Sequence, residues 1–167
     1  KILKGFLGDK SVTDLKEVKK VVSKIKAVEP TINQLSDDGL RDKTAEFKAK
    51  LTAATANITA QIEETKEQIK NSKDVDEKEN LFTKIEELKK DSYQIEEKVL
   101  KEILPEAFAL IKETSRRLAE NGEIRVKATE LDRELASTKD FVSIEGETAI
   151  WVNHWDAAGT AVKWDMV

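Results

Sequence analysis

Two stretches in the middle of the chain place apolar or small residues at alternating steps of four and three. The first series is Leu51, Thr55, Ile58, Ile62, Thr65 and Ile69, and the second is Leu81, Ile85, Leu88, Ser92, Ile95 and Val99. Such steps define the contact seam of a coiled coil. A short polar loop separates the two series, so the helices are expected to fold back on each other. The sequence therefore predicts a long antiparallel helical hairpin, about 45 Å in length at 1.5 Å per residue.

Helical spacing is also present before the hairpin. Apolar residues recur over Leu15–Val28 and predict a first helix that Ser11 and Thr13 can cap. Pro30 is expected to close this helix or to begin the next, because proline suits a first helical turn better than an interior. A second helix start is expected at Ser36, leading into the hairpin.

After the hairpin, a further helix is expected from Pro105 to Glu120, ended by Asn121-Gly122. Its predicted buried stripe consists of Ala107, Phe108, Ile111 and Leu118. This is the most apolar helical stretch of the chain, so we expect it to pack against a large surface.

The period changes to two after Gly122, which is typical of strands. Ile124, Val126 and Ala128 alternate with charged residues, and a short helix is expected over 129–136. Strands over 141–144 and 148–152 flank a turn at residues 145–147, and a third strand over 161–166 follows a second turn. The prediction is a mainly α chain with a small β-meander. Its parts are N-terminal helices at 1–51, a hairpin at 52–99, a helix at 100–122 and a β-rich segment at 123–167.

Composition narrows the class of protein. Charged residues make up 37 % of the chain, above the roughly 25 % of an ordinary domain, which favours long solvated helices. The net charge of -4 argues against a nucleic-acid partner. The absence of Cys excludes thiolate metal sites and disulfides, and favours a cytoplasmic location. The first residue is Lys rather than Met, so we expect a piece cut from a longer protein.

No constellation of residues indicates catalysis or a metal centre. His154 is the only histidine, and a single histidine without cysteine is a poor basis for a metal site. The paired glutamates of the hairpin, such as Glu63-Glu64, are expected on solvated helix faces. Trp151, Trp155 and Trp164 suit a stacking platform, but we favour them as the core of a thin meander.

The N-terminal helix is basic, since residues 1–30 hold eight lysines against four acidic residues. Lys16, Lys19, Lys20 and Lys24 could contact an anionic membrane surface or a partner protein. The alternative, which we favour, is a helix packed on its parent fold with its lysines in water, because its apolar stripe has no Trp or Phe anchor.

Two segments resemble the N-terminus of SecA, the ATP-driven motor of bacterial preprotein export. The first runs from Ala27-Val-Glu-Pro30 through Leu35-Ser-Asp-Asp38 to Leu40-Arg-Asp-Lys-Thr-Ala-Glu-Phe-Lys48. The second runs from Leu104-Pro-Glu-Ala-Phe-Ala109 to Lys112-Glu-Thr-Ser-Arg-Arg117. Together they span about a fifth of the chain, and the order and identity of their residues make the resemblance specific. Arg116 and Arg117 match the family's arginine pair, and the resemblance implies surface or salt-bridging residues beside the first nucleotide-binding domain of the longer protein.

The resemblance implies a longer protein that couples ATP hydrolysis to preprotein movement through the SecYEG channel. Its cofactors would be ATP and Mg²⁺, and it would be located at the inner face of the cell membrane. The resemblance does not decide whether the protein forms a homodimer. In the family, the adenine-recognition segment and the Walker A loop come just after the position of Val167. Met166 would then lie at the rim of the adenine pocket, and this chain would have no nucleotide site of its own.

Residues that depart from the family pattern suggest two insertions. The hairpin, roughly Thr52–Val99, stands where most members have a short loop, and Leu118–Asp165 stands before the nucleotide-binding core. Gly39 occupies a position where the family usually has Glu in a capping box. Two alternatives remain: a coiled-coil adaptor that is complete as it stands, and a membrane-surface module that uses the basic helix.

Overall fold

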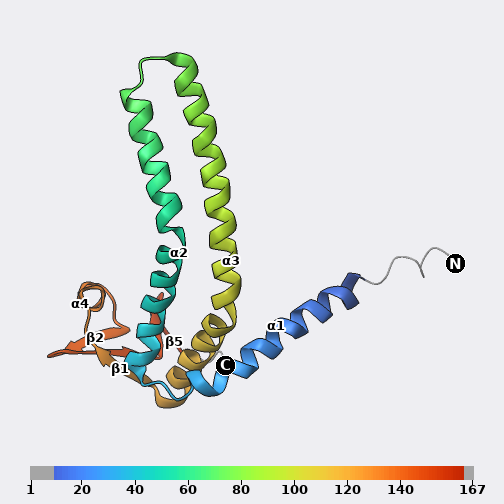
Figure 1. Cartoon of the computed structure of the whole chain (residues 1–167). Helices are drawn as coiled ribbons and strands as arrows, with labels where there is room; N and C mark the ends of the chain where they lie inside the picture. Colours follow the sequence, from blue (N-terminus) through green and yellow to red (C-terminus); the bar gives the residue numbers. More distant parts are fainter. Residues whose placement is uncertain (1–9, 164–167) are drawn as a thin grey trace, which may run out of the picture. The chain divides into compact units, whose positions relative to one another are not determined.

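The structure, a computed structural model, describes the backbone of residues 10–163 and the side chains of residues 14–163. Its helices are α1 (Lys10–Ile32), α2 (Asp37–Asn71), α3 (Val75–Asn121) and α4 (Glu130–Ala136). Its strands are β1 (Glu123–Lys127), β2 (Val142–Glu145), β3 (Thr148–Val152), β4 (His154–Ala157) and β5 (Thr160–Lys163). One compact unit contains the residues up to Lys43 and from Pro105 onward, and the other is Thr44–Leu104. The predicted fold class, mainly α with a small β part, is confirmed (Figure 1).

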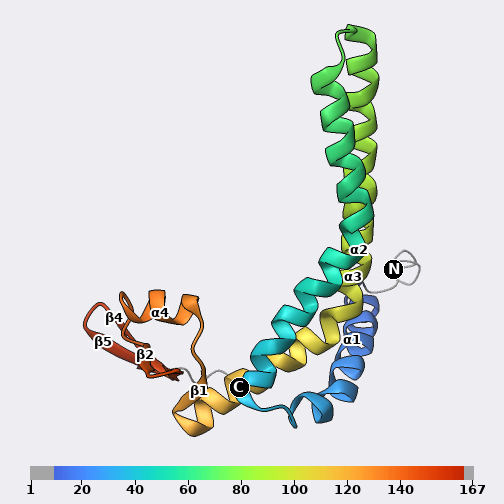
Figure 2. The same ribbon diagram turned by 60° about the vertical axis from the view of Figure 1, so that its left-hand side comes forward.

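The unit of residues 44–104 is the helical hairpin, in which α2 and α3 run side by side in opposite directions (Figures 1 and 2). Every residue of the two predicted seams is buried or half-buried. Ile58 and Ile85 are buried apolar residues, and Thr65 is only 1 % exposed. The Thr65 hydroxyl donates to the Gln61 carbonyl at 2.7 Å, so this polar seam position keeps a hydrogen-bond partner. The tip is capped by Asp74, whose carboxylate accepts from the backbone N–H of Asp76 at 2.8 Å.

The helix starts follow the capping rules in part. α1 begins at Lys10, so Ser11 and Thr13 lie within its first turn rather than ahead of it, and it ends at Ile32, beyond Pro30. Ser36 is the cap of α2, as predicted, because its hydroxyl accepts from the backbone N–H of Gly39 at 3.0 Å.

The predicted helix boundary at Pro105 is wrong, since α3 continues through this residue. A proline inside a helix loses one backbone hydrogen bond and costs about 3 kcal/mol. Packing on both sides offsets that cost, because Ala109 and Leu110 are buried about one turn later and the seam ends at Val99, six residues earlier. A proline of this kind is therefore tolerated between two stretches of α3 that are each held by packing.

The predicted buried stripe of this part of α3 is also wrong in its main residues. Phe108 and Ile111 are 56 % and 65 % exposed, whereas Ala107 and Leu118 are half-buried. The buried positions are Ala109, Leu110 and Glu113. Apolar residues surround this helix on several sides, so their spacing alone could not identify the face that packs within this chain.

The strands β1, β3 and β2 form an antiparallel sheet in that order, with β3 in the centre. Ile124 and Val126, which alternate with charged residues along β1, are buried together with Ala149 of β3, and Leu118 of α3 packs against them. Thr129 caps the predicted short helix, α4, through a reciprocal hydrogen-bond pair with Asp132. The core of this sheet is therefore small, and it is covered by side chains from α3 and from the sheet itself.

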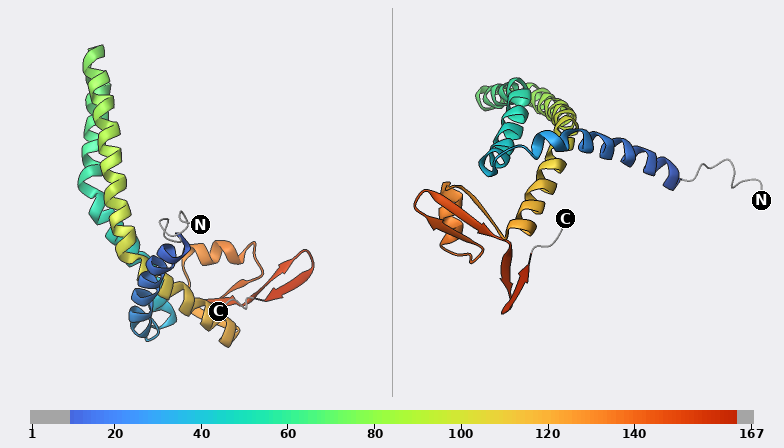
Figure 3. Two further views of the ribbon diagram at one scale, coloured as in Figure 1. Left: turned by 90° about the vertical axis from the view of Figure 1, so that its right-hand side faces the viewer. Right: turned by 90° about the horizontal axis from the view of Figure 1, so that it is seen from below.

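The prediction of a single meander is wrong, because β4 and β5 form a separate two-stranded ribbon (Figure 3). The predicted turn is present and uses Ala158 and Gly159, with φ of 55° and 80°. Two consecutive left-handed residues match the twist of a tight hairpin. The first sheet ends where the N–H of Asn153 donates to the carbonyl of Gly122 at 2.9 Å, which turns the chain into β4.

Candidate functional site

A charged contact links the first turns of α2 to the cap of α4. The Arg41 guanidinium donates to both carboxylate oxygens of Asp132, at 2.6 Å and 2.9 Å. Arg41 also donates to the Lys127 carbonyl at 3.0 Å, and the Lys127 N–H donates to the Asp38 carboxylate at 2.7 Å. Two side chains of α2 therefore hold the end of β1 and the start of α4. We call the contact of Arg41 with Asp132 the α2–α4 clamp.

Asp132 is the centre of the clamp, because its side chain is only 1 % exposed. Besides Arg41, it accepts from the Thr129 N–H and hydroxyl, both at 2.7 Å, and from the Trp151 indole N–H at 3.0 Å. Burial raises the pKa of this carboxyl, but the hydrogen bonds from Arg41 and Thr129 outweigh burial and lower the pKa to about 2. Asp132 is therefore an anion at neutral pH, stabilised by every group that faces it in these contacts.

A second cluster of charges joins α3 to the connection between α1 and α2. Arg117 donates to Glu113 at 2.7 Å, to Asp37 at 2.6 Å and to the Leu35 carbonyl at 2.7 Å. Arg116 donates to Glu113 through two nitrogens, at 2.8 Å and 2.7 Å, and also to Glu120. The predicted salt bridges of the arginine pair are thus present.

Glu113 is the buried anion of this second cluster, with a side chain 2 % exposed. The hydrogen bond from Arg116 is the largest influence on it and lowers its pKa, burial opposes this, and Arg117 lowers it further. The pKa of Arg116 is raised in turn, chiefly by its hydrogen bond with Glu113. Both clusters are arranged to hold elements together, since their donors and acceptors are already satisfied within the chain.

The lysines predicted as a membrane or partner surface, Lys16, Lys19, Lys20 and Lys24, are all exposed on α1. Its apolar side chains are also open to solvent, with Leu15 and Val18 at 53 % and 56 % exposure. Met166 lies outside the described residues, and so does Trp164.

The aromatic prediction holds for one tryptophan. Trp151 is half-buried beside Phe141, with ring centroids 5.8 Å apart, whereas Trp155 is 36 % exposed and His154 is exposed. Trp155 is therefore not part of the core of the three-stranded sheet, because β4 belongs to the separate ribbon that it forms with β5.

Sequence reasoning gave no role to the residues that form the clamp. Arg41 and Asp132 are 91 positions apart, and no spacing rule relates them. The available signal was local: Thr129 followed three residues later by Asp132 has the form of a capping box, which places that carboxylate at a helix start.

Membrane-spanning helices and metal-binding clusters are both lacking in the part of the chain that the structure describes. Within residues 10–163, no helix combines the length and the apolar composition needed to cross a membrane. Over the same range, no three His, Asp or Glu side chains gather in a way that could hold a metal ion.

The chain is similar to proteins of known family over almost its full length. A family model described as the SecA DEAD-like domain matches residues 3–129. The protein translocase subunit SecA of Christiangramia forsetii is 47 % identical over 166 residues, which is 99 % of this chain and 15 % of that protein. The subunit of the same name from Porphyromonas gingivalis is 49 % identical over 162 residues, 97 % of this chain and 14 % of that protein.

The similarity extends to other bacteria at a comparable level. The protein translocase subunit SecA of Bacteroides fragilis is 44 % identical over 165 residues, 99 % of this chain and 15 % of that protein. No solved structure matches the chain. The chain spans about 15 % of the length of these relatives, and the similarity includes both the hairpin and most of the β-containing part. On this similarity and the match of the domain model, the chain belongs to the SecA family.

Proposed function

We propose that this chain is the N-terminal segment of a motor that couples ATP hydrolysis to the export of preproteins through the SecYEG channel. The observation that carries the proposal is the similarity to SecA subunits over 99 % of the chain. The two charged clusters would hold the segment rigid, and ATP and Mg²⁺ would bind elsewhere in the longer protein. The motor would work at the inner face of the cell membrane.

The test is preprotein transport by the longer protein that contains this segment. Purified protein, ATP and a radiolabelled preprotein are mixed with inverted membrane vesicles that carry SecYEG. We expect ATP-dependent protection of the preprotein from added protease, and none with vesicles depleted of SecYEG. Protection that is equal with and without ATP would contradict a motor function.

We further propose that residues 52–99 and 118–165 are insertions between older family segments. The compactness of Thr44–Leu104 as a unit supports this for the hairpin. Replacement of Thr52–Val99 by a short Gly-Ser linker is expected to preserve the Trp151 environment, measured by near-ultraviolet circular dichroism. Loss of that signal would show that the hairpin is needed for the rest of the chain to fold.

The lysine face of α1 is proposed to contact the anionic membrane surface, and its support is the exposure of both the lysines and the neighbouring apolar residues. Changing Lys16, Lys19, Lys20 and Lys24 to Gln is expected to reduce flotation with vesicles rich in anionic lipid. The matched control changes four lysines of the hairpin, Lys84, Lys89, Lys90 and Lys98. Equal loss in both variants would contradict a specific contact.

Met166 is proposed to lie at the rim of the adenine pocket of the longer protein. The proposal rests on the family pattern alone. Substitution of Met166 by Ala in the longer protein is expected to weaken ATP binding several-fold, whereas an unchanged affinity would remove the residue from the site.

A further inference from the structure

Within the hairpin unit, the large apolar side chains that remain exposed all lie on α3. They are Val75, Phe82, Tyr93 and Leu100, with exposures of 76 %, 57 %, 64 % and 49 %. Over residues 44–71, the part of α2 in the same unit, no large apolar side chain is exposed. One helix of the hairpin therefore presents an apolar surface that the other lacks.

These four residues form one straight line along the helix. They are separated by 7, 11 and 7 positions. At 3.6 residues per turn, or about 100° per residue, all four fall within about 20° of one another, over a length of about 37 Å. We call this line the outer stripe. A seven-residue repeat alone would wind left-handed and an eleven-residue repeat right-handed, so their alternation keeps the line straight and suits a rod-like partner, a second helix.

The hairpin does not need the outer stripe for its own stability. Its seam is a different face of α3, where Ile85 is buried and Ser92 is half-buried. If stability of the hairpin were the only requirement, its aromatic residues would be expected in the seam. Instead, Thr65 occupies a buried seam position while Phe82 and Tyr93 are exposed to water. Large exposed apolar side chains in a row mark an interaction surface, and aromatic residues are enriched at such surfaces.

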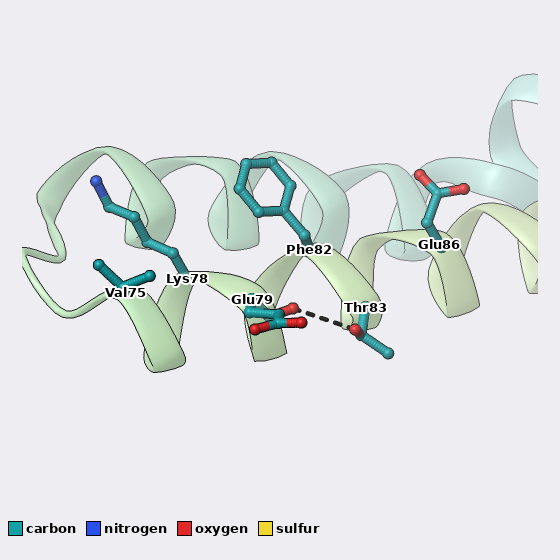
Figure 4. A pocket seen from close by; sticks show the side chains of 6 residues that line it. All are labelled: Val75, Lys78, Glu79, Phe82, Thr83 and Glu86. Atoms are coloured by element: carbon teal, nitrogen blue, oxygen red, sulfur yellow. Dashed lines mark hydrogen bonds between the residues drawn. The ribbon is translucent and has the colours of Figure 1, made fainter.

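Charges flank the outer stripe unequally. Helical spacing places Lys78 and Lys89 on one side, and Glu79, Glu86 and Glu97 on the other. Near the tip, Val75, Lys78, Glu79, Phe82, Thr83 and Glu86 line a shallow groove. Figure 4 shows Phe82 standing on the same side of α3 as Val75 and Lys78, with Glu86 further along. The minority charges are Glu96 on the lysine side, which accepts from Ser92 at 3.2 Å, and Lys90 on the glutamate side.

The flanking charges favour one kind of partner. When two identical helices pair in parallel, the lysine side of each lies beside the glutamate side of the other, whereas antiparallel pairing brings like charges together. Lys89 and Glu86 bond to each other at 2.8 Å and are 56 % and 73 % exposed, so they can exchange partners without uncovering a buried charge.

We propose that the outer stripe is the contact surface for a second copy of this chain, with the two α3 helices parallel. The contact would place Phe82 beside Phe82 and Tyr93 beside Tyr93 across a two-fold axis. This inference stands on the hairpin alone and does not depend on the translocation activity proposed above.

The test exploits the absence of Cys from the chain. Single substitutions Tyr93→Cys and Lys84→Cys are made in the 167-residue chain, the second on the opposite side of the same helix. Under mild oxidation, Tyr93→Cys is expected to form a covalent dimer at least about tenfold faster than Lys84→Cys, because disulfides need Cα atoms about 4.4–6.8 Å apart. Equal rates for the two variants would overturn the proposal.

Orientation and reversibility give two further readouts. In a mixture of Phe82→Cys and Tyr93→Cys chains, parallel pairing yields like-with-like dimers, and a predominance of the mixed dimer would overturn the parallel arrangement. By sedimentation equilibrium, the chain is expected to dimerise and the double substitution Phe82→Ser, Tyr93→Ser to weaken dimerisation at least about tenfold, about 1.4 kcal/mol. Lys84→Ser, Lys98→Ser is the matched control, and helix content is checked by circular dichroism. A chain that stays monomeric at all concentrations would refute the contact.

Discussion

The carboxylate of Asp132 and the guanidinium of Arg41 share two hydrogen bonds, 2.6 Å and 2.9 Å long, across 91 positions of sequence. Arg41 lies in the first segment that resembles the SecA pattern, and Asp132 lies in the stretch we propose as an insertion. Their contact fastens the β-containing part to the family segment through a buried charge. Disrupting this contact is therefore expected to change the free energy of unfolding, which can be measured.

Substitution of Asp132 by Asn is expected to lower the free energy of unfolding by about 2–3 kcal/mol, because it leaves the Arg41 guanidinium without its anion. Arg41 is 31 % exposed, so water recovers part of the loss. The measurement is urea unfolding followed by near-ultraviolet circular dichroism. Glu130→Gln, an exposed change in the same turn of α4, is the control, and equal effects of the two substitutions would contradict the clamp.

The clamp also makes stability depend on pH in the acid range. Asp132 has a pKa of about 2 in the folded chain against the ordinary 3.8, so the folded state holds this proton less tightly than the unfolded state. Its stabilisation, on the order of 2 kcal/mol, is complete above about pH 5 and is lost as the pH falls from 3.8 toward 2. Unfolding of the native chain and of Asp132→Asn is compared at pH 6 and pH 2.5. The difference between them should shrink at the lower pH, and a constant difference would refute this origin.

The two neighbouring arginines are expected to differ in importance. Arg117 is 12 % exposed and joins three elements, whereas Arg116 is 39 % exposed and bonds only within α3. Arg117→Lys should lower the free energy of unfolding by about 2 kcal/mol, since the single ammonium group of lysine cannot replace the several N–H donors of the guanidinium. Arg116→Lys should lower it by less than about 1 kcal/mol. Thermal unfolding of the two variants in parallel measures this, and a larger loss from Arg116→Lys would contradict the assignment.

The proline inside α3 offers a stabilising change. Pro105→Ala restores a backbone donor to a helix that already continues through this position, so we expect stability to rise by about 1–2 kcal/mol after the gain in unfolded-state freedom is subtracted. The readout is the midpoint of thermal unfolding at 222 nm, with Ala53→Gly as an opposite control in the exposed face of α2. A lower midpoint for Pro105→Ala would show that α3 needs a break there.

The hairpin was predictable because its information is periodic. Each arm repeats the four-and-three step over six positions, and these residues are buried or half-buried. The capping of α2 by Ser36 and the turn at Gly159 were equally local. The alternation of Ile124 and Val126 was also predictable, since a two-residue period places side chains on one face of a strand and not on one face of a helix.

The parts that sequence did not predict depend on choices between equivalent local patterns. Pro105 has a preferred position at helix starts, but packing on both sides of it outweighs that preference. Phe108 and Ile111 have the same helical spacing as a core stripe, yet the buried face is the one with Glu113, because Arg116 and Arg117 neutralise it. The α2–α4 clamp could not be predicted from the sequence, since Arg41 and Asp132 are 91 positions apart and only the fold brings them together.

We propose that this chain is a structural segment of a translocation motor and that the nucleotide site lies in another part of the longer protein. Isothermal titration of ATP with Mg²⁺ into the 167-residue chain and into the longer protein tests it directly. We expect heat of binding from the longer protein and none from the chain. Stoichiometric, Mg²⁺-dependent binding of ATP by residues 1–167 alone would contradict the claim.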